Sequence, residues 1–533
     1  MFMKYTKLLK FFDKKRAEKV NFVEPFLRTT LPKGFTPTKV TKKVGLATVY
    51  VEPPFYYVED PPLDQNTIIE YKRIIEDELK WLPGSLFVSN EQIIDSLKTH
   101  GINDQVLLYY IERELIGYSV LQPLIDDEEV EDIVIASPGT SVSVKHKLGN
   151  LQTNIVLDKE RLDELAERLA SKAEKSVSTY NPLLSTRLPD GNRLTLNYGT
   201  EVSHKGTSIA IRKFPKSPWS ITKILLNASA TPDVLAWLWL LIENKKALLV
   251  TGTSGVGKTS LINALTSFIP SNARVVTIED AGELKLSHSH WTPLIARPSY
   301  TQNRYAEITL DQLVKHALRM SADYIIVGEI RGEEGRTWAQ SVLTGHGGIT
   351  SIHSETPQLA IQRLTSQPIL VEPQALTALH GIVELRASGG KRYIATVLDH
   401  EFLPKKGSVF KKVYSFNHTS VSSIRQEELV DLPTAKQLIE QGIYTRQELL
   451  SEIRCRTNLL ETLYVEAHVD SELLSHEFVS KISWIYQQKP ELRQKPEEII
   501  RSIRPVCPSC GAPLNQGECP TCSVINKIEA NIK

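Results

Sequence analysis

The middle of the chain alternates short apolar runs with stretches of helical periodicity. The apolar runs are residues 247–251, 274–279, 324–328 and 349–352. Strands that are apolar on both faces and separated by helices are typical of a mostly parallel sheet covered on both sides. Residues 381–415 change to glycine-punctuated strands, which predict an antiparallel extension of that sheet. We therefore expect an α/β domain over residues 219–425.

The flanking regions carry different patterns. Residues 1–65 begin with basic residues and continue with many prolines, which predicts an extended leader rather than a domain. Residues 66–218 mix helical periodicity with short strands and end in a proline-rich linker, so we expect an α+β domain there. The strands expected in it are 133–135, 142–145, 194–196 and 208–211, with a helix over 159–175. Residues 426–502 predict a helical tail.

The first twenty residues form a short basic amphipathic pattern. Tyr5, Leu8, Leu9 and Phe12 recur at helical spacing among seven Lys/Arg and two acidic residues. Such a segment is able to contact an anionic membrane surface or an acidic partner. An ordinary first helix with a solvated face fits the same pattern equally well.

Composition and charge argue against several classes of protein. The chain has 63 Lys+Arg against 62 Asp+Glu, so there is no general electrostatic attraction for a nucleic acid. No apolar run approaches the ~20 residues that a membrane span needs. The basic start also lacks the uninterrupted apolar core of a signal peptide. We expect a cytoplasmic protein with no nucleic-acid partner.

A glycine-rich turn joins the first apolar run to a helical pattern. Residues 252–259 fit the pattern G-x-x-x-x-G-K-[ST] in a strand–loop–helix context. Glycines let backbone N–H groups wrap phosphate oxygens at a helix N-terminus, where the helix dipole favours anions. We expect Lys258 to reach the β- and γ-phosphates of a nucleoside triphosphate and Thr259 to ligate Mg²⁺. The predicted contacts are Gly252, Thr253, Ser254, Gly255, Val256, Gly257, Lys258, Thr259 and Ser260.

Two acidic residues follow apolar strands at the edge where parallel sheets build ligand sites. Glu329 comes directly after residues 324–328, and we expect it to ligate Mg²⁺ or polarise the attacking water. Glu279 ends the run 274–279 and is expected to assist. How the two carboxylates divide these roles stays open at this stage.

Two histidines, His346 and His353, flank a glycine-rich strand entry in the same domain. A lone histidine is usually structural, but a pair placed beside a nucleotide site favours a sensor of the γ-phosphate. Both residues are therefore candidates for the catalytic site.

These motifs, taken in order, resemble the secretion ATPases of type II and type IV systems. That superfamily powers pilus assembly, type II secretion and the archaeal swimming filament. The matching segments are the phosphate loop, an Asp box at 278–284, a Walker B box at 327–332, a His box at 344–346 with His353, and arginine-bearing segments at 188–193 and 211–214. The resemblance covers residues 105–485 and implies a RecA-like ATPase domain that binds ATP.

The resemblance also implies a mechanism. ATP would lie between the N-terminal and ATPase domains of a homo-hexameric ring. Arg193 and Arg212 match the family segments and Arg187 lies near them, so all three are candidates to stabilise the transition state, with surface salt bridging as the alternative for each. Arg331 would hold the loop of Glu329 or contact a neighbouring subunit. Domain closure and reopening would convert hydrolysis into motion.

The last cysteines have the spacing of a zinc ribbon over residues 503–526. Cys507, Cys510, Cys519 and Cys522 follow the pattern C-x₂-C-x₈-C-x₂-C. Four thiolates suit a closed, structural Zn²⁺ site; the alternative, two disulfides, is disfavoured in an intracellular chain. Bacterial relatives often carry a four-cysteine module inside the ATPase domain, where this chain has no cysteine. That difference favours an archaeal-type member.

The sequence thus predicts a hexameric ATPase motor peripheral at the inner face of the cytoplasmic membrane. It would power assembly of a type IV pilus-like filament, or type II/IV-type secretion, through an inner-membrane platform protein. The motor of the archaeal swimming filament is the closest alternative. A nucleic-acid translocase that uses the zinc ribbon is a second alternative, against which the neutral charge argues. A nucleotide-dependent scaffold with weak turnover is a third.

Overall fold

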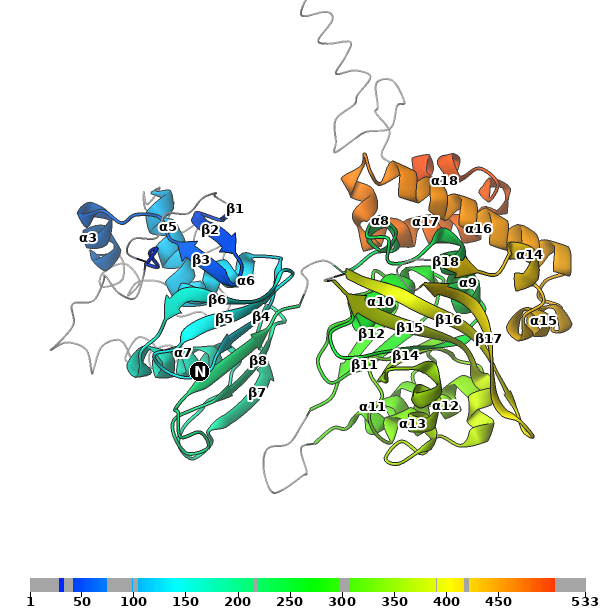
Figure 1. Cartoon of the computed structure of the whole chain (residues 1–533), viewed down its shortest axis with the longest axis horizontal. Coiled ribbons are helices and arrows are strands. Elements are labelled where there is room, and N and C mark those ends of the chain that lie inside the picture. The colour runs from blue at the N-terminus through cyan, green and yellow to red at the C-terminus, as the bar shows by residue number, and fades with distance from the viewer. Residues whose placement is uncertain are drawn as a thin grey trace, which may run out of the picture. The chain divides into compact units, whose positions relative to one another are not determined.

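The computed structural model describes residues 28–32, 42–73, 98, 104–214, 218–297, 307–389, 391–416 and 421–503. The chain divides into two compact units, residues 1–215 and 216–533, close to the boundary predicted at residue 218. Each unit is built around its own sheet (Figure 1). The basic segment 1–20 and the four cysteines of the predicted zinc ribbon lie outside the described residues.

The first unit contains a nine-stranded sheet that is antiparallel except between β3 and β6. In spatial order its strands are β1 (Lys42–Val44), β2 (Ala47–Glu52), β3 (Phe55–Glu59), β6 (Gly149–Val156), β5 (Ser141–His146), β4 (Val130–Ile135), β9 (Ser208–Arg212), β8 (Arg193–Asn197) and β7 (Leu183–Arg187). Its α-helices are α3 (Gln65–Arg73), α5 (Gln105–Ile111), α6 (Gln122–Asp126) and α7 (Lys159–Lys172), and a π-helical turn covers Glu112–Ile116. Leu162 and Leu169 of α7 pack on the buried side of the sheet.

The prediction of an extended leader over residues 1–65 is wrong for its second half. Residues 42–59 form β1, β2 and β3, which extend the sheet of the first unit. Val49, Tyr56 and Val58 are fully buried there, and the Tyr56 hydroxyl donates to Asp127 at 2.5 Å. The prolines of this region lie outside the strands. Within β3, and at the start of β2, buried and more exposed side chains alternate, which is the pattern of a strand with one face on the core.

The second unit contains a nine-stranded sheet whose first six strands in spatial order are parallel. The order is β12 (Trp291–Ile295), β11 (Val275–Glu279), β13 (Tyr324–Val327), β14 (Gly347–His353), β10 (Ala247–Gly252), β15 (Leu379–Ser388), β16 (Lys391–Leu403), β17 (Gly407–Phe416) and β18 (Val421–Ser423). Strands β15 to β18 are joined antiparallel, as the alternation over residues 381–415 predicts. The predicted α/β class is confirmed.

Helices cover this sheet and extend beyond it (Figure 1). They are α8 (Ile221–Leu226), α9 (Pro232–Glu243), α10 (Lys258–Leu265), α11 (Leu310–Ala317), α12 (Glu334–Leu343), α13 (Pro357–Thr365), α14 (Gln426–Leu429), α15 (Pro433–Glu440), α16 (Arg446–Glu466), α17 (His476–Gln488) and α18 (Pro496–Ile503). Short 3₁₀ turns connect several of them.

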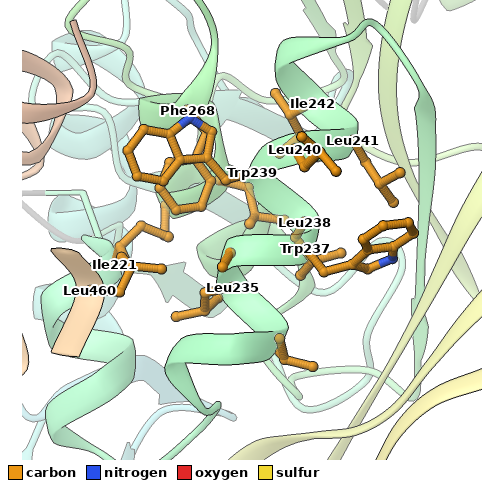
Figure 2. Packing of buried hydrophobic residues seen from close by; sticks show 14 of the residues in the cluster. Ile221, Leu235, Trp237, Leu238, Trp239, Leu240, Leu241, Ile242, Phe268 and Leu460 are labelled. Atoms are coloured by element: carbon orange, nitrogen blue, oxygen red, sulfur yellow. The ribbon is translucent and has the colours of Figure 1, made fainter. Parts of the chain in front are cut away.

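Helix α9 is buried all round, from Val234 to Ile242, because it lies between the sheet and the helical tail. Figure 2 shows Trp237 directed toward the strands, while Trp239 packs on the other side against Phe268. The rings of Trp239 and Phe268 stack with centroids 4.7 Å apart. Leu460 of α16 belongs to the same core. The predicted tail 426–502 therefore shares one hydrophobic core with the sheet of the second unit.

Arg456 joins helix α16 of the tail to helix α9 through an ion pair. Its guanidinium is fully buried and bonds Glu243 at 2.8 Å and Glu452 at 2.6 Å. It also lies over the rings of Trp239 and Tyr486. A buried cation needs such partners because desolvation of an unpaired charge is very unfavourable.

Candidate nucleotide-binding site

The carboxyl ends of four adjacent parallel strands bring the predicted site residues of the second unit together. In the sheet order β11-β13-β14-β10, Glu279 ends β11, Glu329 follows β13, His353 ends β14 and Gly252 ends β10. Gly252 and His353 are direct partners in the register of β10 and β14. Ligand sites in such sheets lie beyond the carboxyl ends of the strands. Four sequence motifs separated along the chain therefore meet at one edge.

The phosphate loop connects β10 to the N-terminus of α10. Gly257 is the N-cap of α10 and has φ +94°, a left-handed conformation that a β-carbon would strain. The following backbone N–H groups have no partners within the helix, so the helix start is suited to bind phosphate oxygens. Thr259 and Ser260 lie in this first turn.

Lys258 is buried and turned back across the loop. Its ammonium donates to the carbonyls of Gly252 and Thr253, both at 3.0 Å. Burial lowers the pKa of Lys258 to about 8, and the carboxylate of Glu329 opposes part of this shift. An anion placed beside Lys258 would stabilise its charged form.

His353 lies between Lys258 and Glu329. Its Nδ1 is 3.1 Å from Nζ of Lys258, and its Nε2 is 3.0 Å from Oε1 of Glu329. Burial lowers the pKa of His353, and the charge of Lys258 lowers it further. Because the ammonium of Lys258 can only donate a hydrogen bond, Nδ1 of His353 is the acceptor in this contact. In the neutral imidazole the proton is then on Nε2. The carbonyl of His353 is held by Arg363 at 2.5 Å.

Glu329 is held from its other side by Arg331. The guanidinium donates to Oε2 of Glu329 at 2.5 Å and lies 3.5 Å from Asp280, as expected of a residue that holds this loop. Oε1 of Glu329 is buried, and it lies near His353 without the alignment of a hydrogen bond. No hydrogen bond to this oxygen is made within the described residues. It can therefore still bind a metal ion or accept a hydrogen bond from a water molecule.

Glu279 has a different environment. It is buried, and its carboxylate accepts hydrogen bonds from the backbone N–H groups of Glu283 at 3.0 Å and Leu284 at 3.1 Å. A β-carbon on Gly328 would lie 3.1 Å from Cγ of Glu279, so a larger residue there would press on the Glu279 side chain. Glu279 thus holds the loop that follows β11, whereas Oε1 of Glu329 accepts no hydrogen bond from the described residues.

The two candidate histidines lie at opposite edges of the sheet. His346 precedes β14 and bonds the carbonyl of Ser341 at 2.9 Å, whereas His353 ends the same strand. At ~3.3 Å per residue the strand separates them by roughly 20 Å. His346 is therefore not part of the site around Lys258, contrary to the expectation that placed it beside the γ-phosphate. The strand register, invisible in the motif, decides between them.

The three arginine candidates form one row on the sheet of the first unit. Arg187 is the register partner of Arg193, and Arg193 is the partner of Arg212 on the next strand. Their neighbours Leu194 and Ile211 are buried, so alternation puts the arginines on the opposite face. Arg212 pairs with Asp132 at 3.0 Å, and Arg187 donates to the carbonyl of Gly191 at 3.2 Å. Like charges placed opposite one another destabilise a sheet, and Asp132, the register partner of Arg212, offsets part of this repulsion.

Residues that hold these groups were missed by the sequence analysis. Asn192, which is buried, accepts from the N–H of Phe214 at 3.0 Å and donates to Asp190 at 2.8 Å, so it fixes the turn between Arg187 and Arg193. Ser351 donates to the carbonyl of Gly328 at 2.7 Å and holds the strand end before Glu329. Single polar residues of this kind carry no signal in one sequence.

Among the described residues, no group of three or more His, Cys, Asp or Glu side chains is arranged to hold a metal ion. In the same part of the chain, no helix combines the length and apolar character needed to cross a bilayer.

The sequence is similar to one protein family and to individual relatives. The family described as type II/IV secretion system protein matches residues 117–505. An uncharacterized protein of Methanocaldococcus jannaschii is 36% identical over 266 residues, which are 50% of this chain and 48% of that relative. A type IV secretion system protein PtlH homolog of Bordetella bronchiseptica is 32% identical over 268 residues, 46% of this chain and 78% of that relative. The chain thus spans about half the length of the archaeal relative.

Two solved structures match the chain with low overall similarity. The VirB11 ATPase from the Brucella suis type IV secretion system has 25% sequence identity and a TM-score of 0.28, covering 52% of this chain and 92% of that one. The Legionella pneumophila ATPase DotB has 18% identity and a TM-score of 0.38, covering 66% and 91%.

Proposed function

The chain belongs to the type II/IV secretion system protein family, and on this premise we propose that it hydrolyses ATP to drive a membrane-associated assembly or secretion machine. The observation that carries the proposal is the contiguous line Lys258–His353–Glu329, which runs from the phosphate loop to the carboxylate beyond β13. Each of these groups has a task in phosphoryl transfer, and each comes from a different strand end.

The proposed roles follow from the contacts. Lys258 binds the β- and γ-phosphates, and the N–H groups at the start of α10 bind the oxygens beside it. His353 connects Lys258 to Glu329 and so responds to the presence of the γ-phosphate. Glu329 polarises the attacking water, and Arg331 keeps its carboxylate in place. Glu279 holds the loop after β11 and supports this edge of the site.

The residues also fit Mg²⁺. This ion binds proteins through one or two carboxylates or hydroxyls together with substrate phosphates and water, so a dedicated cluster of ligands is not required. The hydroxyl of Thr259 would hold it, together with phosphate oxygens and water. When bound, Mg²⁺ neutralises charge that develops on the phosphates.

The wider assembly is part of the proposal. The family resemblance supports a homo-hexamer in which the row of Arg187, Arg193 and Arg212 supplies positive charge to the transition state. We propose that the ring works at the inner face of the cytoplasmic membrane, on a platform protein of a pilus-like filament or a secretion system. Cys507, Cys510, Cys519 and Cys522 remain proposed ligands of a structural Zn²⁺.

The proposal is tested by measuring phosphate release from ATP together with mass in solution, with and without nucleotide. Turnover should rise as hexamers form, and Lys258→Ala should abolish nucleotide binding. Lys245→Ala is the matched control, because this lysine precedes β10 at the opposite edge and pairs with Asp323 at 3.0 Å. Nucleotide affinity that survives in Lys258→Ala, or a monomer without turnover, would contradict the proposal. Stimulation by duplex DNA would favour a translocase instead.

A further inference from the structure

The hairpin of β15 and β16 extends past the start of the phosphate loop. Thr251, the last residue but one of β10, pairs with Glu384 of β15, and β15 continues to Ser388 before the chain returns as β16. The hairpin lies close to the loop, because a β-carbon on Gly252 would lie 2.7 Å from the carbonyl oxygen of Leu385. The nucleotide loop therefore has a second wall on the side of β15.

Arg392 is the residue of this hairpin that reaches the helix start. A β-carbon on Gly257 would lie 3.6 Å from Cδ of Arg392, so the arginine side chain passes directly beside the N-cap of α10. The backbone of Arg392 is fixed by the segment between α8 and α9. Its carbonyl accepts from the Ser229 hydroxyl at 2.8 Å, and the N–H of Ile394 donates to the Ser229 carbonyl at 2.8 Å.

The sheet order decides which part of the nucleotide Arg392 meets. Strand β10 lies between β14 and β15, so His353 and Glu329 flank the loop from one side and Arg392 from the other. The γ-phosphate belongs on the side of the proposed water-polarising Glu329. Arg392 is therefore placed for the phosphates nearer the nucleoside. A guanidinium beside a helix N-terminus is favourable when phosphate oxygens lie between them, and its fork binds two oxygens at once.

We propose that Arg392 is a nucleotide-binding residue that contacts the α- and β-phosphates, the diphosphate part common to ADP and ATP. This inference rests on the proposed ATPase function and adds a contact from the antiparallel extension of the sheet. The sequence pattern of the phosphate loop does not include it, because the hairpin follows the loop by more than a hundred residues.

The test compares Arg392→Ala with Arg386→Ala. Arg386 lies on the same hairpin and pairs with Glu384 at 2.7 Å. Its register partner is Tyr393, whereas Arg392 is the partner of Ala387, so the two arginines face opposite sides of the hairpin. Binding of ADP, of ATP and of inorganic pyrophosphate is measured by calorimetry on the full chain. We expect Arg392→Ala to weaken ADP and ATP to a similar extent, on the order of 10-fold or more, and Arg386→Ala to leave both unchanged.

Several results would overturn the inference. The first is an unchanged affinity for ADP and ATP in Arg392→Ala. The second is a weakened affinity for ADP together with an unchanged affinity for pyrophosphate, which would indicate a contact to the base. Arg392→Lys guards against misfolding, since it should fold like the wild type and recover part of the affinity. Wild-type chain that binds no nucleotide would instead remove the proposed function itself, so the two failures are distinguishable.

Discussion

Nδ1 of His353 lies 3.1 Å from Nζ of Lys258, and this contact joins the His box to the phosphate loop. It exists because β14 and β10 are neighbours in the sheet and because Gly252 and His353 end those strands in register. The same imidazole reaches Glu329 with its other nitrogen. One side chain therefore connects the group that binds phosphate with the group proposed to act on water.

This connection predicts different outcomes for the two histidines. His353→Ala should lower ATP turnover on the order of 10²-fold while nucleotide binding persists, because a polar group aimed at the reacting phosphate is lost. His346→Ala is the matched control and should leave turnover unchanged, because His346 bonds Ser341 at the far edge of the sheet. Steady-state kinetics and equilibrium binding on both variants decide the question. Equal losses in the two variants would contradict the assignment.

Substitutions of Glu329 and Glu279 should affect different properties, turnover in the first case and stability in the second. Glu329→Gln removes the proposed water-polarising group, so turnover should fall by about 10² or more while stability and ATP binding are kept. Glu279→Gln weakens the acceptance of two backbone N–H groups and should lower the free energy of unfolding by roughly 1–3 kcal/mol.

Thermal unfolding and phosphate release distinguish these two effects. Glu333→Gln is a suitable control because Glu333 is exposed at the start of α12 and makes no capping hydrogen bond. Turnover that is lost equally in all three variants would show that the assay reports folding and not chemistry.

The pKa of Lys258 predicts a pH dependence of nucleotide affinity. The pKa is lowered to about 8 by burial, so the side chain loses its proton as pH rises through 8. A bound phosphate stabilises the charged form, and binding above pH 8 therefore requires proton uptake. Affinity should fall about 10-fold per pH unit from pH 8 upward. Calorimetry in two buffers of different ionisation enthalpy measures the uptake; pH-independent affinity up to pH 10 would exclude this pKa.

The arginine row predicts a defect that appears in the working enzyme and not in folding. Arg193→Ala and Arg212→Ala should each lower turnover by about 10³ if they stabilise the transition state. Lys145→Ala is the control, since Lys145 lies on β5 of the same sheet and pairs with Glu131 at 3.1 Å. Turnover at saturating ATP and melting temperature are compared. A variant that melts normally and retains full turnover would assign that arginine to surface pairing.

Buried histidines predict acid sensitivity of the second unit. Burial lowers the pKa of His476 and of His380 to about 4. Between pH 6.5 and 4 the unfolded chain binds protons that the folded chain does not, so stability is lost as pH falls, by about 1.4 kcal/mol per unit for each histidine. Asp399, whose pKa burial raises to about 6, acts oppositely below pH 6. The two histidines together outweigh it.

Melting temperatures between pH 7.5 and 4.5 measure this effect. His476→Gln should flatten the profile, because the variant has no titrating group at that position. The exposed His468 gives a control, and His468→Gln should keep the wild-type slope. An unchanged slope in His476→Gln would show that another group causes the acid sensitivity.

Local pattern was sufficient for the parallel strands but not for the elements at their margins. The runs at 247–251, 324–328 and 349–352 became β10, β13 and β14, because burial on both faces leaves an unbroken apolar signal. The short edge strand β12 and the strands β1 to β3 were not predicted. These strands are short, β1 and β12 lie at sheet edges, and the prolines around β1 to β3 obscure their alternation.

The sequence by itself determined the phosphate loop, the family and the identity of the acidic groups, because the chemistry of phosphate binding requires residue types at fixed local spacing. Only the tertiary structure placed His353 rather than His346 beside Lys258, gave Glu279 and Glu329 different surroundings, and brought Arg392 beside the loop. These depend on strand order and register, which bring together residues that are far apart in the chain. Local spacing carries no information about such pairings, since hydrogen bonding and packing between distant segments set them.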